Sequence, residues 1–295
     1  KLSIGDWFRG AAVLKARGRG QSPAVEVTEG RLDLRNLPEF GSSKGGGGGS
    51  TPISARLNRV QVTESIALDG FSGKFGTQGG FNGSFAAALN GQAPLRGTVV
   101  PAQGGTAIRV QSEDAGGVLA AAGIFSKARG GTLDLQLLPL GPKGHYRGTA
   151  RAEAFRVRNA PVLAELLSAI SVVGILEKLN GPGLVFSEGE ADFRLTPAGV
   201  EVNRGAAVGL SMGVSMAGTY DARSKRLNMQ GVISPIYLLN GVGAVLTREG
   251  EGLFGFSYRL GGSSDDPSVS VNPLSILTPG MFREIFRRPV PRLQE

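Results

Sequence analysis

The chain has 295 residues, a formal net charge of +8 and no cysteine, which excludes disulfides, thiol catalysis and thiolate metal sites. Its 47 glycines are about twice the usual share. Because glycine is unfavourable inside helices, this composition favours strands and turns. The basic residues are scattered except near the C-terminus, so we do not expect nucleic acid as a partner.

The sequence contains no run of about 18 uninterrupted apolar residues, so no membrane-spanning helix is predicted. The chain begins at Lys1, where no signal peptide is visible. We therefore expect a fragment or a processed form of a longer protein.

Residues 1–40 are predicted to form upstream β-strands, because residues 24–27 and 31–35 alternate apolar and polar side chains. Residues 41–52 follow as a Gly/Ser-rich loop or linker. A run of this composition is flexible. It is either an engineered joint or a natural loop between strands, and the similar strand pattern on both sides favours the natural loop.

Residues 53–274 continue the period-two alternation, with strands bounded by Gly, Asn, Pro and Asp clusters. Phe71, Gly73 and Phe75 share one parity, as do Phe81 and Phe85. The pattern predicts a mainly β fold, a meander of short antiparallel strands, with one or two short helices capping or plugging it and a short C-terminal helix.

One predicted strand carries large apolar side chains on one face and small ones on the other. The large row is Val208, Leu210, Met212, Val214 and Met216. Such a strand suits either a cavity lining or ordinary core packing, and methionine is well adapted to variable apolar partners.

Two segments are predicted to be helical. Residues 113–123 have Ser112 or Asp114 as a candidate cap and Gly123 as a stop. Residues 160–179 begin with Pro161 in the first turn and place apolar residues at helical spacing. This second helix is either a cap on a sheet end or a wall or gate of an apolar cavity, formed by Leu163, Leu166, Leu167, Ile170 and Val173.

The search for catalytic groups finds no recognisable apparatus. His145 is the only histidine, and one histidine without cysteine makes no conventional zinc site. Asp265 and Asp266 precede Pro267 in a segment with ordinary turn chemistry. We therefore predict no enzyme activity, no catalytic residue, no metal and no cofactor.

The C-terminal tail, residues 275–295, is basic and amphipathic. A helix there would place apolar side chains on one side, next to arginines, and would suit either an anionic membrane surface or a partner protein. It could equally dock on its own domain. The residues concerned are Phe282, Arg283, Ile285, Phe286, Arg287 and Arg288.

Several motifs in a consistent order resemble the C-terminal region of AsmA-like proteins, the bacterial envelope group that includes AsmA, YhdP and TamB. The resemblance spans roughly residues 64 to 288. The motifs are Ser112–Leu119 with Gly130–Leu133, Asn159–Leu163 through Ala169–Gly174 to Gly183–Phe186, Ala191–Arg194, Gly205–Gly209 to Gly218–Asp221, and Phe254–Gly262 to Asp266–Leu274.

The resemblance implies a periplasmic location and an inner-membrane anchor that this chain lacks. It also implies an elongated, curled antiparallel β-sheet that forms a groove with an apolar interior. Larger members of the group are thought to carry phospholipids towards the outer membrane. We therefore expect an AsmA-like groove domain over residues 53–274 that binds phospholipid acyl chains, with an outer-membrane or periplasmic protein as a further partner at the C-terminal end. The expected groove-lining residues are Val208, Leu210, Met212, Val214, Met216, Phe193, Leu195, Phe254 and Phe256.

The alternative is a non-catalytic structural or assembly factor for outer-membrane proteins, acting through a sheet edge or the basic tail. It predicts a filled β core without a continuous groove.

Overall fold

The computed structural model describes residues 2–38, 50–170, 172–235, 255–264 and 266–272, and it confirms the predicted fold class. Strands account for 61% of it, in one open, curled sheet. The strands are β1 (Leu2–Ile4), β2 (Phe8–Lys15), β3 (Ala24–Asp33), β4 (Ile53–Gln61), β5 (Ala67–Gly76), β6 (Asn82–Leu89), β7 (Ala93–Ala102), β8 (Gly105–Ser112), β9 (Thr132–Pro139), β10 (Tyr146–Val157), β11 (Leu184–Thr196), β12 (Gly199–Gly209), β13 (Met212–Asp221), β14 (Arg226–Pro235), β15 (Phe256–Gly262) and β16 (Pro267–Asn272).

The strands follow one another in the sheet in their sequence order, from β1 to β16. Neighbouring strands pair antiparallel except β3 and β4, which pair in parallel. Before β4 begins, Arg17 Nη1 donates to the Ser50 backbone oxygen at 2.7 Å. The sheet therefore continues from the strands before the glycine run to those after it.

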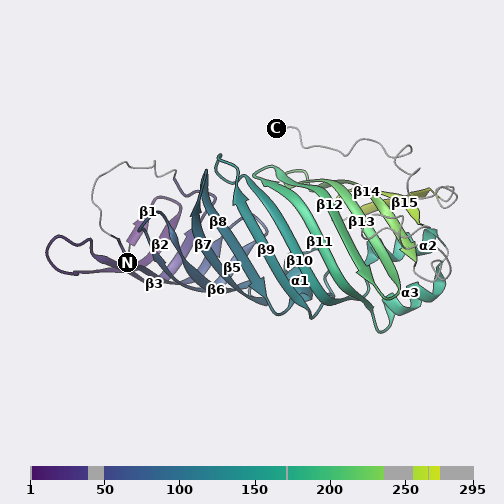
Figure 1. Ribbon diagram of the computed structural model, residues 1–295, viewed down its shortest axis with the longest axis horizontal. Helices are drawn as coiled ribbons and strands as arrows, with labels where there is room; N and C mark the ends of the chain where they lie inside the picture. Colours follow the sequence, from purple (N-terminus) through teal and green to yellow (C-terminus); the bar gives the residue numbers. More distant parts are fainter. Residues whose placement is uncertain (1, 39–49, 171, 236–254, 265, 273–295) are drawn as a thin grey trace.

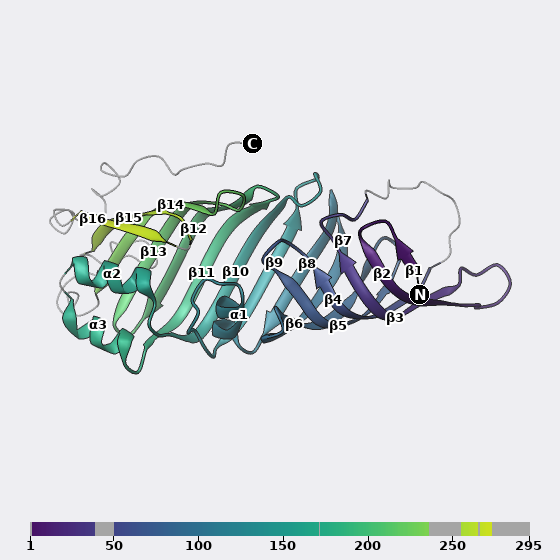
Figure 2. The ribbon, with the colours of Figure 1, turned by 180° about the vertical axis from the view of Figure 1, so that it is seen from behind.

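The molecule is elongated, and its strands cross the long axis obliquely (Figure 1). β1–β3 and the N-terminus lie at one end. The other end carries β14–β16 together with two short helices. Seen from behind, all three helices lie in front of the sheet, on one of its two faces (Figure 2).

Each strand presents one apolar and one polar face, as the period-two alternation predicts. Residues on the apolar face pair with one another from strand to strand, in a row that runs Val27, Ala55, Gly73, Phe85, Gly97, Val110, Leu135, Ala150, Ala191, Gly205, Met216, Gly231, Tyr258 and Val271. The adjacent row on the polar face runs Glu26, Ser54, Lys74, Ser84, Thr98, Arg109, Gln136, Thr149, Asp192 and Arg204.

The first predicted helix is present as α1 (Ala115–Ala121), and Asp114 is its N-cap. The Asp114 side chain accepts hydrogen bonds from the backbone N–H groups of Gly117, at 2.8 Å, and Gly130, at 2.7 Å. One carboxylate therefore caps the helix and holds the returning chain beside it.

The second predicted helix is two helices, α2 (Pro161–Ala169) and α3 (Val173–Asn180). The prediction of one helix over residues 160–179 was wrong because the sequence between them, Ile170 to Val173, is mostly β-branched and favours helix weakly. The Val172 N–H donates to the Leu167 oxygen at 3.0 Å, so the chain turns between the helices.

Residues 208–216 are a hairpin rather than one strand, so the prediction of a single apolar row was wrong. β12 ends at Gly209 and β13 begins at Met212, and Val208 pairs with Gly213. Since an even-numbered residue pairs with an odd-numbered one, parity reverses across this two-residue loop. Val208 therefore lies on the polar face, and Leu210 lies in the loop with 84% of its surface exposed.

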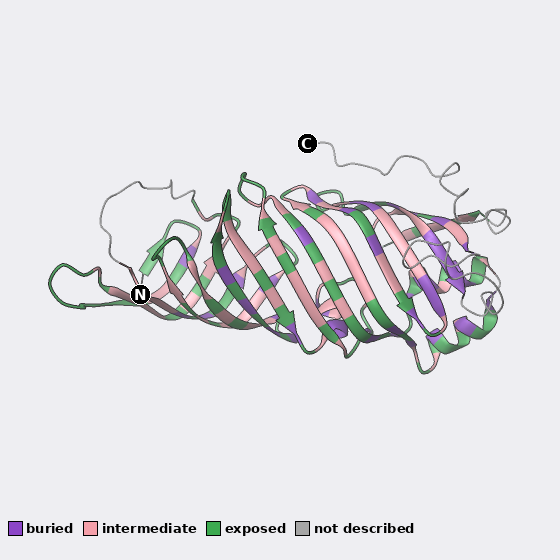
Figure 3. Cartoon of the chain, viewed as in Figure 1, coloured by how far each residue is buried: buried purple, intermediate pink, exposed green. Residues whose placement is uncertain are grey.

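Burial is greatest at the helix-bearing end (Figure 3). The largest hydrophobic cluster joins α1, α2 and α3 to the apolar face of β10–β15, whereas two smaller clusters lie further towards the N-terminus. Within the described residues, no helix is long and apolar enough to cross a membrane. The predicted C-terminal helix and the residues 282–288 assigned to membrane or partner contact lie outside the described residues.

Candidate functional site

The apolar face over β3–β9 carries partly exposed apolar side chains among buried ones, such as Val60, Leu95 and Val99, which are 2–7% exposed. A second apolar row crosses it through Ile53, Phe75, Ile108 and Leu137, which are connected by strand pairing through Gly83 and Val99. These four side chains are half-buried. Of the helices, α1 packs on β7, within this stretch, and on β10, whereas α2 packs on β16 and α3 on β11.

Four phenylalanines make this face aromatic near the N-terminal end. The rings of Phe71 and Phe85 stack at a centroid distance of 5.3 Å, Phe71 and Phe75 at 6.2 Å, and Phe75 and Phe81 at 5.0 Å. Phe81, at the end of this series, is 42% exposed. Stacked rings of this kind form a continuous apolar surface that solvent reaches from one side.

Glycines on the neighbouring strands let these rings lie flat against the sheet. A Cβ built on Gly97 would lie 2.1 Å from the ring of Phe85, and one built on Gly83 would lie 2.6 Å from the ring of Phe75. Any larger residue would push the ring away from the backbone. The pairing of glycine with phenylalanine therefore keeps these rings close to the backbone of the neighbouring strand.

The C-terminal half of the same face is a packed core. Met212 and Ile233, on β13 and β14, are at most 1% exposed, and they belong to one cluster with the inward side chains of α2 and α3. Phe155 and Phe186 stack within it at 5.3 Å. This half anchors the helices, and the open surface lies over β3–β9.

The predicted groove-lining residues divide accordingly. Phe193, Met212, Val214, Met216 and Phe256 lie on the apolar face in or against the packed cluster. Leu195 also lies on this face, half-buried opposite Tyr146 and Val200. Val208 and Leu210 do not lie on it, because the hairpin places Val208 on the polar face and Leu210 in the loop. Phe254 lies outside the described residues.

The predicted helix wall is largely a set of core contacts. Leu163, Leu166 and Leu167 are buried, and Ile170 packs partly buried against the same cluster. Val173 points elsewhere, with 62% of its surface exposed. The break between α2 and α3 accounts for this, because Val173 begins a new helix and does not continue the buried stripe of α2.

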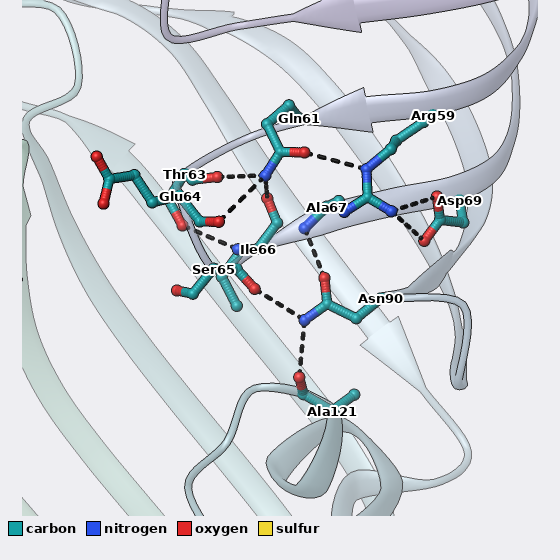
Figure 4. A network of polar contacts seen from close by, with 10 residues as sticks. All are labelled: Arg59, Gln61, Thr63, Glu64, Ser65, Ile66, Ala67, Asp69, Asn90 and Ala121. Carbon is teal, nitrogen blue, oxygen red and sulfur yellow. Dashed lines mark hydrogen bonds and ion pairs between the residues drawn. The ribbon is translucent and has the colours of Figure 1, made fainter. Parts of the chain in front are cut away.

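Asn90 fastens α1 to the sheet (Figure 4). Its Oδ1 accepts from the Ala67 N–H at 2.8 Å, and its Nδ2 donates to the backbone oxygens of Ser65 at 2.9 Å and Ala121 at 2.8 Å. Asn90 holds a left-handed backbone with φ of 48°, which asparagine tolerates better than most residues. The last turn of α1 is thereby joined to the β4–β5 turn.

A contact between residues distant in sequence joins the β9–β10 turn to the segment that follows β3. Lys143 Nζ, in the β9–β10 turn, donates to the backbone oxygen of Leu37, which follows β3. These residues are 106 positions apart, and their strands are separated by five others in the sheet. The sheet therefore curls far enough across β3–β9 to bring this turn and this segment into contact.

The polar chemistry of the apolar face is limited to buried hydroxyls. Burial raises the pKa of the Tyr258 phenol, whose hydroxyl donates to the Ser215 backbone oxygen at 2.9 Å. His145 Nδ1 lies 3.1 Å from the Lys143 backbone oxygen. Within the part of the chain that the structure describes, no three His, Cys, Asp or Glu side chains gather as a metal site would require.

The open residues Ile53, Phe75, Ile108 and Leu137 were missed as site residues at the sequence level. Their signal was the repeated alternation of phenylalanine with glycine at one parity, as in Phe71-Ser72-Gly73-Lys74-Phe75. That alternation identifies an aromatic face next to residues without side chains, although only the register shows which glycine each ring covers.

The chain matches no protein-family model, no curated protein and no solved structure.

Proposed function

We propose that the open apolar face over β3–β9 binds the acyl chains of phospholipids. The observation that carries the proposal is the continuous line of half-buried Ile53, Phe75, Ile108 and Leu137 beside the stacked phenylalanines. Exposed apolar surface is typical of a site that binds an apolar partner, and these four side chains are partly exposed. The same strands turn polar side chains to the other face.

The dimensions of this face suit a hydrocarbon chain. Seven strands spaced about 4.8 Å apart span about 29 Å, whereas one acyl chain occupies about half of a roughly 30 Å hydrocarbon core. Burial stabilises a bound chain by about 0.8 kcal/mol per methylene. Because these contacts are non-directional, a chain can move along the face without breaking a specific polar contact.

The setting that we propose follows the resemblance to AsmA-like proteins. In it the chain is a non-catalytic periplasmic part of an envelope protein anchored in the inner membrane, and it carries phospholipids between the inner and outer membranes. The packed helices α2 and α3 close one end of the face, so lipid would occupy the strands that precede β10.

Lipid binding is tested with two neighbouring substitutions on opposite faces. Leu137→Glu places a carboxylate on the apolar face, where it would lose hydration next to hydrocarbon. Gln136→Glu adds the same charge to the exposed polar face. After incubation with phosphatidylethanolamine, native mass spectrometry should show about tenfold less bound lipid for Leu137→Glu, since about 1.4 kcal/mol corresponds to that factor, and no change for Gln136→Glu.

The comparison requires that both variants fold, which their circular dichroism and melting temperatures establish. A folded Leu137→Glu protein that keeps its lipid contradicts the proposal. So does equal loss in both variants, because that result would assign the effect to net charge.

A second candidate function has its own structural support. Among the described strands, β1 and β16 end the sheet with one unpaired edge each, and such an edge can receive a strand from another protein. An assembly factor acting in this way would form a stable protein complex and bind no lipid, so the same mass spectra distinguish the two functions.

A further inference from the structure

The polar face carries a hollow that the lipid proposal does not use. It encloses about 790 Å³ over β3–β8 and is lined by polar-face residues of all six strands. The residues between them in the strands, Val27, Ala55, Gly73, Phe85 and Gly97, also line it. Its floor consists of small residues, Ser54, Ser72, Ser84, Ala86 and Thr98. Long basic side chains stand around this floor.

The hollow is strongly positive. Arg56, Lys74, Arg96 and Arg109 line it, and Glu26 is the acidic residue among its lining. Glu26 pairs with Lys15, and Arg109 pairs with Asp134. Within the described residues, no carboxylate lies within 4.0 Å of the charged groups of Lys74 and Arg96. Arg56 exerts only a weak electrostatic influence on the pKa of Glu26.

The charges further along the same face are arranged differently. Arg151 pairs with Glu188 and Glu190, and Arg204 pairs with Asp192. Arg151 and Arg204, over β10–β12, are thus matched by carboxylates of the chain itself. The three exposed cations over β4, β5 and β7 are not, so this part of the face is complementary to an anion from outside.

The shape of the hollow selects the form of that anion. It crosses six strands, about 24 Å, and takes in about three residues of each strand, roughly 10 Å. A planar membrane would rest on the arginine side chains without filling the floor. A single extended peptide of about seven residues has this length and width, and the serine and threonine hydroxyls of the floor can donate to its carboxylates.

We propose that this hollow is a docking site for an extended acidic segment of a partner protein, held by Arg56, Lys74 and Arg96. Its position on the face opposite the phenylalanines lets a partner bind while lipid occupies the apolar face. Attraction between exposed charges is screened by salt. The complex should therefore be transient and salt-sensitive.

The probe is a fluorescein-labelled deca-aspartate peptide, titrated with the full chain by fluorescence anisotropy. Deca-serine, phosphatidylglycerol vesicles and dextran sulfate are compared under the same conditions. The test variant combines Arg56→Gln, Lys74→Gln and Arg96→Gln. The matched control combines Arg147→Gln, Arg223→Gln and Arg226→Gln, which removes the same net charge at exposed positions outside the hollow.

The proposal predicts that deca-aspartate binds, that its affinity falls about tenfold when salt rises from about 0.05 M to about 0.3 M, and that the test variant loses about tenfold while the control changes less than about twofold. Equal losses in both variants would overturn it, since net charge alone would then explain binding. It is also overturned if vesicles or dextran sulfate, and not the peptide, depend on the three cations. Lipid binding should be unchanged in the test variant, so this result is independent of the proposed lipid function.

Discussion

Single residues set the depth of the apolar face. Phe85 and Phe75 lie flat because glycine faces them on the adjoining strand. The same arrangement of a glycine facing a phenylalanine ring recurs in the packed half, where a Cβ on Gly148 would lie 2.2 Å from the ring of Phe193. Gly97, Gly83 and Gly148 thus each allow one aromatic ring to lie close to the backbone.

Gly97→Ala should force the Phe85 ring out of its position and into the space where lipid is proposed to lie. We expect a loss of about 1–3 kcal/mol in the free energy of unfolding, as for other overpacked sites, and reduced lipid binding. Chemical denaturation and native mass spectrometry measure the two effects. Phe85→Leu in the same chain should restore part of each.

Gly174→Ala should change the free energy of unfolding in the opposite direction from Gly97→Ala. Gly174 lies in the exposed first turn of α3, where an added Cβ meets nothing within 4 Å, so alanine should be neutral or stabilise by up to about 1 kcal/mol. Equal destabilisation by both substitutions would mean that contact with Phe85 is not the cause.

The ion pair of Asp134 and Arg109 gives a pH-dependent contribution to stability. Hydrogen bonds from the Arg109 guanidinium lower the pKa of Asp134 below its ordinary value of 3.8. A lowered carboxylate pKa stabilises the folded state above the ordinary value, and this contribution is lost as the pH falls through the folded-state value. Wild type should melt at a higher temperature than Asp134→Asn at neutral pH. The difference should shrink as the pH falls below 3.8 and vanish below the folded-state pKa of Asp134. A difference that persists there would contradict this origin.

At the scale of elements, the helices depend on contacts that join them to turns. Asn90 connects three backbone segments, including the end of α1. Asn90→Ala removes all three hydrogen bonds and should destabilise the chain by about 1–3 kcal/mol. Hydrogen exchange should show α1 losing protection more than the strands do.

Asn82→Ala is the matched control, because Asn82 binds only the oxygens of Gln78 and Gly80 within its own turn. It should leave α1 protected. If α1 exchanges equally in both variants, Asn90 is not its anchor.

The hairpin of β12 and β13 makes a direct prediction about two neighbouring apolar residues. Leu210 is exposed in the loop and Met212 is 1% exposed in the core. Leu210→Ala should change the free energy of unfolding by less than about 0.5 kcal/mol, and Met212→Ala should lower it by about 2–5 kcal/mol. Denaturant titration of the two variants measures both, and comparable losses would restore the single-strand interpretation.

Alternation and turn residues in the sequence were sufficient to predict the β class, whereas the curl of the sheet was expected from the resemblance to AsmA-like proteins. The same alternation and turn residues located α1 through Asp114 and Gly123. They failed at residues 208–216, because a two-residue loop continues the alternation while the register reverses its faces. They also predicted one helix where the structure has α2 and α3, because the helical spacing of apolar residues continues across the β-branched residues between the two helices. The site could not be resolved for a related reason: periodicity identifies an apolar face, whereas tertiary packing determines where helices cover it.

At the scale of the whole molecule, one continuous apolar face serves two purposes. Over β10–β15 it holds α2 and α3 in a packed core. Over β3–β9 it is lined by half-buried aliphatic side chains and stacked phenylalanines. The opposite face carries charged and hydroxylated side chains throughout these strands. The proposed lipid and the proposed protein partner would thus occupy separate faces of the same sheet.

The most direct measurement is photocrosslinking at two adjacent positions with opposite orientations. A photoreactive phenylalanine analogue in place of Phe85 lies on the apolar face, and the same analogue in place of Ala86 lies on the exposed polar face. We expect phospholipid to be captured in cells at position 85 and not at position 86. Capture at position 86 alone, or equal capture at both, would contradict the assignment of lipid to the apolar face.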